Sequence, residues 1–278
     1  MKPKLPFVEP TFQIVQLNGQ RFEIIRWSSD VPKALLLPGA TGGIRGYIAL
    51  GTELQSLGLG VAGMNPRGCG GSQASLENLT LRDLANDVID VLSVLCDAPI
   101  LLIGHAGGNR VARMAATMRP DLITGVVLLA AGGMVPPDQD AQVALSQIMS
   151  GSVGRAERHK LYRTALFAPG SKIPDDYFEV SDRSVEFGRA FSAALKATPV
   201  GDWWAGGSCP ILVIQGLQDR IAPPANGYHL KAEFPDRVEV VDLDGAGHAL
   251  CSEKPREIAA LIAAFARRLG AGKQSSTR

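Results

Sequence analysis

One tight glycine turn constrains the fold of this chain more than any other feature. The turn is Gly104-His105-Ala106-Gly107-Gly108; it follows an apolar run at residues 99–103 and precedes a helix-like run at residues 109–118. A sharp turn of this kind needs glycine because a Cβ atom would collide with neighbouring backbone. The sequence therefore predicts a buried strand, a strained turn with Ala106 at its apex, and a helix.

Strands and helices are predicted to alternate along most of the chain. Residues 12–17 and 21–27 roughly alternate apolar and polar positions, and Asn18-Gly19 between them is a strong hairpin signal. Further strands are predicted at residues 34–37, 61–64, 99–103, 125–130, 211–215 and 237–242, and helices at residues 80–95, 109–118, 225–233 and 255–269. Short apolar strands between helices predict an α/β fold, with a mostly parallel twisted sheet covered on both faces and an N-terminal antiparallel hairpin.

A long segment interrupts this alternation. Residues 134–208 are too many for a loop in a compact domain, and they include helix-like stretches at 140–149, 155–167 and 185–197. We therefore predict a core domain formed by residues 1–133 and 209–278, with an inserted helical cap, or lid subdomain, at residues 134–208. The polar tail from residue 270 is predicted to be disordered.

Composition and charge exclude several classes of partner. Of the 278 residues 46% are hydrophobic and 20% are charged, and the net charge of +1 gives no argument for nucleic-acid or membrane binding. We expect no signal sequence and no membrane span, because no apolar segment of the required length occurs. The four cysteines form no C-x-x-C pair. We expect a cytoplasmic protein that acts on a small molecule without a metal or cofactor; whether it forms a homo-oligomer stays open.

Four more segments lie directly after predicted strands. Pro38-Gly39-Ala40-Thr41-Gly42 follows residues 34–37, and Asn65-Pro66-Arg67-Gly68-Cys69-Gly70-Gly71-Ser72 follows residues 61–64. Asp219 follows the strand at 211–215, and His248 follows the strand at 237–242. Loops at the carboxyl ends of parallel strands line the ligand crevice of open α/β sheets.

Together with the glycine turn, these segments resemble the α/β-hydrolase fold superfamily, in the family's own order. That family carries a nucleophile elbow of pattern G-x-S-x-G, followed by an acid and then a histidine. The resemblance covers about residues 12–269 apart from the predicted cap. It departs from the pattern at the apex, where Ala106 replaces serine, and also at Pro38 and Asn65, which replace histidine and aspartate.

The resemblance implies a role for each matching position. Ala106 occupies the nucleophile position, Asp219 the acid and His248 the catalytic histidine. The backbone N–H groups of Ala40 and Gly107 would form the oxyanion hole.

Five neighbouring residues are further candidates for the pocket. Thr41 and Arg45 lie in or just after the oxyanion loop and could contact a ligand, although Arg45 fits a solvated helix residue equally well. His105 is common beside the elbow in this family and is predicted to be structural. Trp203 and Trp204 close the predicted cap and are assigned to packing, with a place in the pocket as the alternative.

Residues 36–45 also have a competing interpretation, as a dinucleotide-binding loop. The stretch from Leu36 to Arg45 is similar to the dinucleotide loop of short-chain dehydrogenases. However, Arg45 stands where the last glycine should be and would crowd a pyrophosphate, and no Tyr-x-x-x-Lys pair occurs. The dinucleotide interpretation also leaves the hairpin and the loops of Asp219 and His248 unexplained, and is rejected.

The missing hydroxyl limits the chemistry. Acyl transfer through the elbow needs an oxygen that the histidine can deprotonate, and losing the serine typically costs on the order of a million-fold in turnover. One hypothesis is therefore an enzyme acting on a small carbonyl- or ester-containing molecule, in which Asp219 orients His248 as general base. A second is an esterase-like serine hydrolase inactivated by a Ser-to-Ala replacement at 106. A third is a non-catalytic ligand-binding protein.

Two observations weigh among these hypotheses. The run from Gly104 to Arg113 is similar to a bacterial subgroup of the family with alanine at the apex, which favours a natural alanine. The presence of both Asp219 and His248 in register disfavours a pure binding protein.

Overall fold

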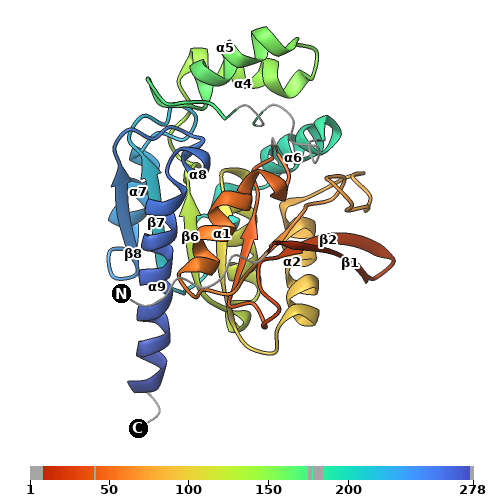
Figure 1. Ribbon diagram of the computed structural model, residues 1–278, viewed down its shortest axis with the longest axis vertical. Helices are drawn as coiled ribbons and strands as arrows, with labels where there is room; N and C mark the ends of the chain where they lie inside the picture. Colours follow the sequence, from red (N-terminus) through yellow and green to blue (C-terminus); the bar gives the residue numbers. More distant parts are fainter. Residues whose placement is uncertain (1–8, 41, 175–176, 178–183, 276–278) are drawn as a thin grey trace.

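Eight strands form one sheet at the centre of the molecule (Figure 1). The computed structural model describes residues 9–40, 42–174, 177 and 184–275. The strands lie in the order β1-β2-β4-β3-β5-β6-β7-β8, and only the pairs β1–β2 and β2–β4 are antiparallel. Their bounds are β1 Thr11–Leu17, β2 Gln20–Arg26, β3 Ala34–Leu37, β4 Val61–Met64, β5 Ile100–His105, β6 Ile123–Leu129, β7 Ile211–Gly216 and β8 Val238–Leu243.

Helices cover both faces of this sheet. They are α1 Ile48–Ser56, α2 Leu81–Leu95, α3 Gly107–Met118, α4 Gln139–Ser150, α5 Arg155–Ala165, α6 Val185–Ala197, α7 Ala225–Glu233, α8 Leu250–Glu253 and α9 Pro255–Ser275. Buried side chains of α1, α8 and α9 form one apolar core with the sheet, and those of α2, α3 and α7 form a second core with it. The predicted α/β fold class is therefore confirmed, because burying both faces is what a mostly parallel sheet requires.

The N-terminal hairpin is also confirmed. Asn18 and Gly19 both have positive φ, at 51° and 76°, as a two-residue turn of type I′ demands. Strands β1 and β2 pair in register from Thr11 opposite Arg26 to Leu17 opposite Gln20.

Two details differ from the sequence analysis. Helix α1 was not among the predicted elements; it holds Gly51 in its interior, where a Cβ atom would lie 2.1 Å from the ring of Trp27. The last helix was predicted to end at Leu269, and this is wrong, because α9 continues to Ser275. Gly270 and Gly272 each cost only about 1 kcal/mol in a helix, and Ala271, Lys273 and Gln274 are good helix formers.

Helices α4, α5 and α6 lie between β6 and β7 in the chain, at the place of the predicted insertion. Side chains of α4 and α5 form a separate apolar cluster that also includes Ala249, and both helices stand at the edge of the molecule in Figure 1. The exact division into a core domain and a cap at 134–208 stays a prediction. No described helix combines the length and the apolar character that crossing a bilayer requires.

Candidate active site

The glycine turn has the strained backbone that its sequence predicts. Strand β5 ends at His105, α3 begins at Gly107, and Ala106 between them has φ 48° and ψ −109°. A Cβ atom at Gly108 would lie 2.3 Å from the carbonyl oxygen of Leu37, so that position requires glycine. A non-glycine residue with this backbone costs of the order of 1–3 kcal/mol. The turn thus presents Ala106 at the end of the strand with only a methyl group as its side chain.

Asp219 and His248 form a hydrogen-bonded pair in the loops after β7 and β8. The Nδ1 atom of His248 lies 2.9 Å and 3.2 Å from the two carboxylate oxygens of Asp219. The backbone N–H groups of Ile221 and Ala222 donate to Asp219 Oδ1 at 2.9 Å and 2.7 Å, which fixes the carboxylate. With Nδ1–H donating to Asp219, the lone pair of His248 lies on Nε2. Within the described part of the chain, Nε2 has no hydrogen-bond partner.

The two amides predicted to form an oxyanion hole come close together. A Cβ atom built on Gly107 would lie 3.1 Å from the backbone nitrogen of Ala40. Neither N–H group donates to an acceptor among the residues that the structure describes. Buried N–H groups are nearly always paired in folded proteins, so two unpaired amides side by side are available to a ligand oxygen.

A cavity of about 180 Å³ joins these groups. Ala40, Ala106, Gly107 and His248 all line it, and Asp219 lies behind the histidine. Part of the remaining wall comes from α4 and α6, through the side chains of Leu145, Met149, Phe191, Ser192 and Leu195. The structure therefore places the five predicted central positions at one site and covers that site with helices of the inserted segment.

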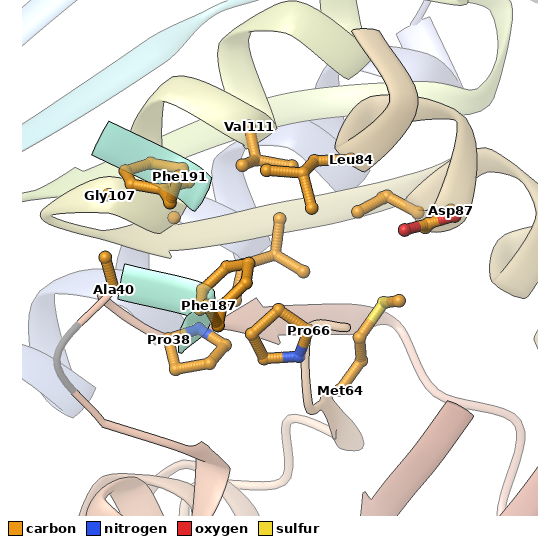
Figure 2. A pocket seen from close by; sticks show the side chains of 13 residues that line it. Pro38, Ala40, Met64, Pro66, Leu84, Asp87, Gly107, Val111, Phe187 and Phe191 are labelled. Atoms are coloured by element: carbon orange, nitrogen blue, oxygen red, sulfur yellow. The ribbon is translucent and has the colours of Figure 1, made fainter. Parts of the chain in front are cut away.

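A smaller apolar pocket of about 30 Å³ shares Ala40, Gly107 and Phe191 with this cavity. Figure 2 shows Phe187 and Phe191 of α6 over it, with Ala40 and Gly107 at one end and Asp87 at the other. Asp87 forms a bidentate ion pair with Arg67, at 2.5 Å and 2.8 Å.

A family model described as "Alpha/beta hydrolase family" matches residues 34–261, which is most of the chain. The chain belongs to the alpha/beta hydrolase family. Among solved structures, it superposes on a putative lipase from Acinetobacter baumannii with a TM-score of 0.79 and 17% identity, covering 95% of this chain and 93% of that one. It superposes on E-2-(acetamidomethylene)succinate hydrolase with a TM-score of 0.75 and 19% identity, covering 92% and 99%. These likenesses show the shared fold.

Curated relatives are distant. The chain is 23% identical over 226 residues to the human mitochondrial palmitoyl-protein thioesterase ABHD10, covering 77% of this chain and 64% of that protein. It is 26% identical over 199 residues to the uncharacterised hydrolase YugF of Bacillus subtilis, covering 67% and 72%. The chain thus spans somewhat less than two thirds of the length of ABHD10.

His105 links the loop after β3, which holds Gly39 and Ala40, to the loop after β8, which holds His248. Its Nε2 donates to the carbonyl oxygen of His248 at 2.8 Å, and its Nδ1 accepts from the hydroxyl of Tyr47 at 2.6 Å. The Tyr47 oxygen in turn accepts from the N–H group of Gly39 at 2.9 Å. Burial, and then the nearby His248, lower the pKa of His105 to about 4, so the ring is neutral at pH 7. Both ring nitrogens of His105 are therefore occupied in holding loops together.

The other pocket candidates lie away from the apex or outside the described residues. The guanidinium of Arg45 pairs with Glu23 at 3.1 Å and stacks over Phe12. Trp203 and Trp204 are buried beside Arg113 and are not among the residues that line the cavity. Thr41 lies outside the described residues.

The replacement of aspartate by Asn65 has a local physical reason. Its side-chain oxygen accepts from the N–H group of Ile44, and its amide nitrogen donates to a carboxylate oxygen of Glu23, both at 2.7 Å. An aspartate could not donate and would place a second negative charge beside Glu23. The asparagine thus suits this hydrolase core.

Among the residues around the site that the sequence analysis missed, Arg110 and Tyr47 carry the polar contacts of most interest. Arg110 lines the cavity, and Tyr47 holds His105. Arg110 stands four residues after Ala106, about one helical turn along α3, and that spacing alone could have indicated it. No comparable signal marks Tyr47, because its contact spans 58 residues.

Proposed function

We propose that the protein is an enzyme acting on a small carbonyl- or ester-containing molecule, with His248 as general base, Asp219 orienting it, and the amides of Ala40 and Gly107 forming an oxyanion hole. One observation carries the proposal. The Nε2 atom of His248 and the amides of Ala40 and Gly107 line a single cavity whose apex, Ala106, has no nucleophilic atom. None of these three groups has a hydrogen-bond partner among the residues that the structure describes.

The proposed step moves one proton and one electron pair. His248 Nε2 takes a proton from a carbon next to the substrate carbonyl, or from a water molecule that attacks that carbonyl. Deprotonation of carbon gives an enolate, and attack by water forms a C–O bond; in both cases the carbonyl π pair moves to the carbonyl oxygen, whose negative charge the two amides hold. With an ester or thioester the tetrahedral anion then expels the alkoxide or thiolate, which takes the proton from His248 Nε2. Asp219 accepts a hydrogen bond from Nδ1 and stabilises the imidazolium that forms. No acyl-enzyme forms, because Ala106 offers no oxygen or sulfur.

The proposal includes that alanine is the natural residue at position 106. The similarity of the run from Gly104 to Arg113 to family members with alanine at the apex supports this. The strained turn, the paired Asp219 and His248 and the two amides are compatible with it, but a Ser-to-Ala variant would keep them too. The family relationship supports carbonyl chemistry, since the distant relative ABHD10 is named a palmitoyl-protein thioesterase and a thioester is a carbonyl compound.

A substrate screen tests the proposal. Wild type and His248→Ala are compared on a panel of ketones, keto esters, esters and thioesters, by proton exchange in D2O followed by NMR and by product formation. Turnover by wild type that falls about 100-fold or more in His248→Ala is expected, the usual size of general-base catalysis. Ligand binding without turnover in either protein would identify a non-catalytic member of the family.

Ala106→Ser separates a natural alanine from an inactivated serine hydrolase. The proposal predicts that this variant gains no strong esterase activity on the same panel. A large gain, with burst kinetics from an acyl-enzyme, would show that the site is a serine hydrolase lacking its nucleophile.

A further inference from the structure

Arg110 brings a positive charge to the wall of the catalytic cavity. It lines the same cavity as Ala106 and His248. Its Nη2 atom lies close to Gly132: a Cβ atom built on that glycine would be 3.0 Å from it. Its guanidinium carbon lies 5.7 Å from the centroid of the Trp203 ring, in a cation–π contact. Within the described residues, it makes no hydrogen bond and no ion pair.

Arg110 is partly exposed, and two other arginines differ from it in their contacts. The fully buried Arg113 keeps Nε and Nη1 without a hydrogen-bond partner among the described residues but uses Nη2. Arg67 forms its bidentate pair with Asp87, and Arg113 donates to Asn109 and to the carbonyl oxygen of Gly132, at 2.8 Å and 2.7 Å. Burial lowers the pKa of Arg110 to about 10, which still leaves the side chain cationic at pH 7. Because Arg110 is only partly exposed and has no ion pair among the described residues, a carboxylate bound in the cavity would gain a charge-assisted contact with it.

The remainder of the cavity fits one negative charge on an apolar molecule. No Asp or Glu is among its described lining residues, and Asp219 is engaged with His248 and two amides. Leu145, Met149, Leu195 and Ile221 supply an apolar surface. The guanidinium thus faces a cavity with no anion of the protein in it.

We propose that Arg110 binds a carboxylate of the substrate, so that the substrate is a small carboxylic acid with an apolar body and a second, reacting carbonyl group. The planar guanidinium matches a carboxylate in two parallel hydrogen bonds. The single positive charge of Arg110 neutralises one carboxylate, whereas a phosphate dianion would keep one negative charge unbalanced. The reacting carbonyl rests on the proposed function, but the carboxylate contact does not.

Calorimetric titration with matched acids and amides tests this inference. The probes are benzoylformate, 3-benzoylpropanoate and 4-oxopentanoate, each with its neutral primary amide. Wild type is expected to bind at least one acid about tenfold or more tightly than its amide, the size of a charge-assisted hydrogen bond. Arg110→Gln should lose this preference while its affinity for the amide stays about the same, and Arg110→Lys should keep part of it because the charge remains.

Arg189→Gln is the matched control. It removes the same charge from α6, which also lines the cavity, but the side chain of Arg189 is exposed and is not part of the lining. This variant should keep the full preference for the acid. The inference is overturned if no pair favours the acid in wild type, if the preference survives in Arg110→Gln, or if Arg189→Gln loses as much.

Two further measurements keep the result interpretable. Arg110→Gln should change the melting temperature little, because among the described residues the side chain makes no hydrogen bond or ion pair. Arg113→Gln should lower it by breaking two buried hydrogen bonds. The preference for the acid should also persist in His248→Ala. Failure of His248 as a base and failure of Arg110 as a carboxylate ligand are therefore observed separately.

Discussion

At the scale of single residues, Ala106 retains a strained backbone at a position with no nucleophile to present. Its positive φ is unfavourable for alanine and easy for glycine, so Ala106→Gly should raise the free energy of unfolding by up to about 1 kcal/mol. That gain corresponds to a rise of about 2 °C in melting temperature for a chain of this size. Thermal denaturation followed by circular dichroism measures it.

Ala112→Gly in α3 is the control for the same chemical change in ordinary helical backbone. It should lower stability by about 2 kcal/mol, since Ala112 is fully buried and loses its methyl packing as well as helix propensity. A fall of similar size in Ala106→Gly would mean that the apex is not strained.

His105 makes stability depend on pH with a defined sign. The pKa of its ring is lowered to about 4 in the folded protein against an ordinary 6.5, because burial and then His248 disfavour the charged form. The folded state therefore keeps a neutral ring, and its contribution is present above pH 6.5 and lost as the pH falls toward 4. The full loss is about 3 kcal/mol from this group.

Urea denaturation of wild type and His105→Asn at several pH values between 4 and 7.5 measures this contribution. The stability difference between the two proteins should shrink as the pH falls. His229→Gln, which changes an exposed histidine in α7, should follow wild type. Parallel curves for wild type and His105→Asn would contradict the assignment.

At the scale of elements, the sequence predicts those whose apolar pattern is strong. Strands β5 and β7 and the hairpin were located to within one or two residues, because their patterns and turn residues agree. Helix α1 was not located, since it carries Gly51 in its interior and owes its place to packing against Trp27. Such a helix depends on a tertiary contact that no local pattern records.

Gly51→Ala tests that contact. The new methyl group would lie 2.1 Å from the Trp27 ring, which is fully buried, so we expect a loss of about 1–3 kcal/mol in stability. Gly46→Ala is the matched control, because a Cβ atom there meets nothing within 4 Å. Equal melting temperatures for the two variants would show that α1 can shift away from Trp27.

At the scale of the whole molecule, the site is assembled from segments that are far apart in the chain. The order of motifs in the sequence indicated Ala40, Ala106, Asp219 and His248, because each follows a predicted strand of one sheet. The sequence could not show that Arg110 makes no hydrogen bond or ion pair with any described residue, since this depends on which side chains surround the cavity. The bridge from Gly39 through Tyr47 to His105 is equally invisible in a linear pattern.

Two features of this family member line one cavity: the histidine that we propose as the base, His248, and an apex residue, Ala106, that has no nucleophilic atom. If catalysis runs through His248, the methyl group at the apex contributes only shape. Removing the imidazole and removing the methyl group should then have very different effects on rate.

The most direct measurement is kcat/KM of wild type, His248→Ala and Ala106→Gly on the substrate that the carbonyl panel identifies. The proposal predicts that His248→Ala loses about 100-fold or more, while Ala106→Gly stays within about tenfold of wild type. Full turnover in His248→Ala would contradict it.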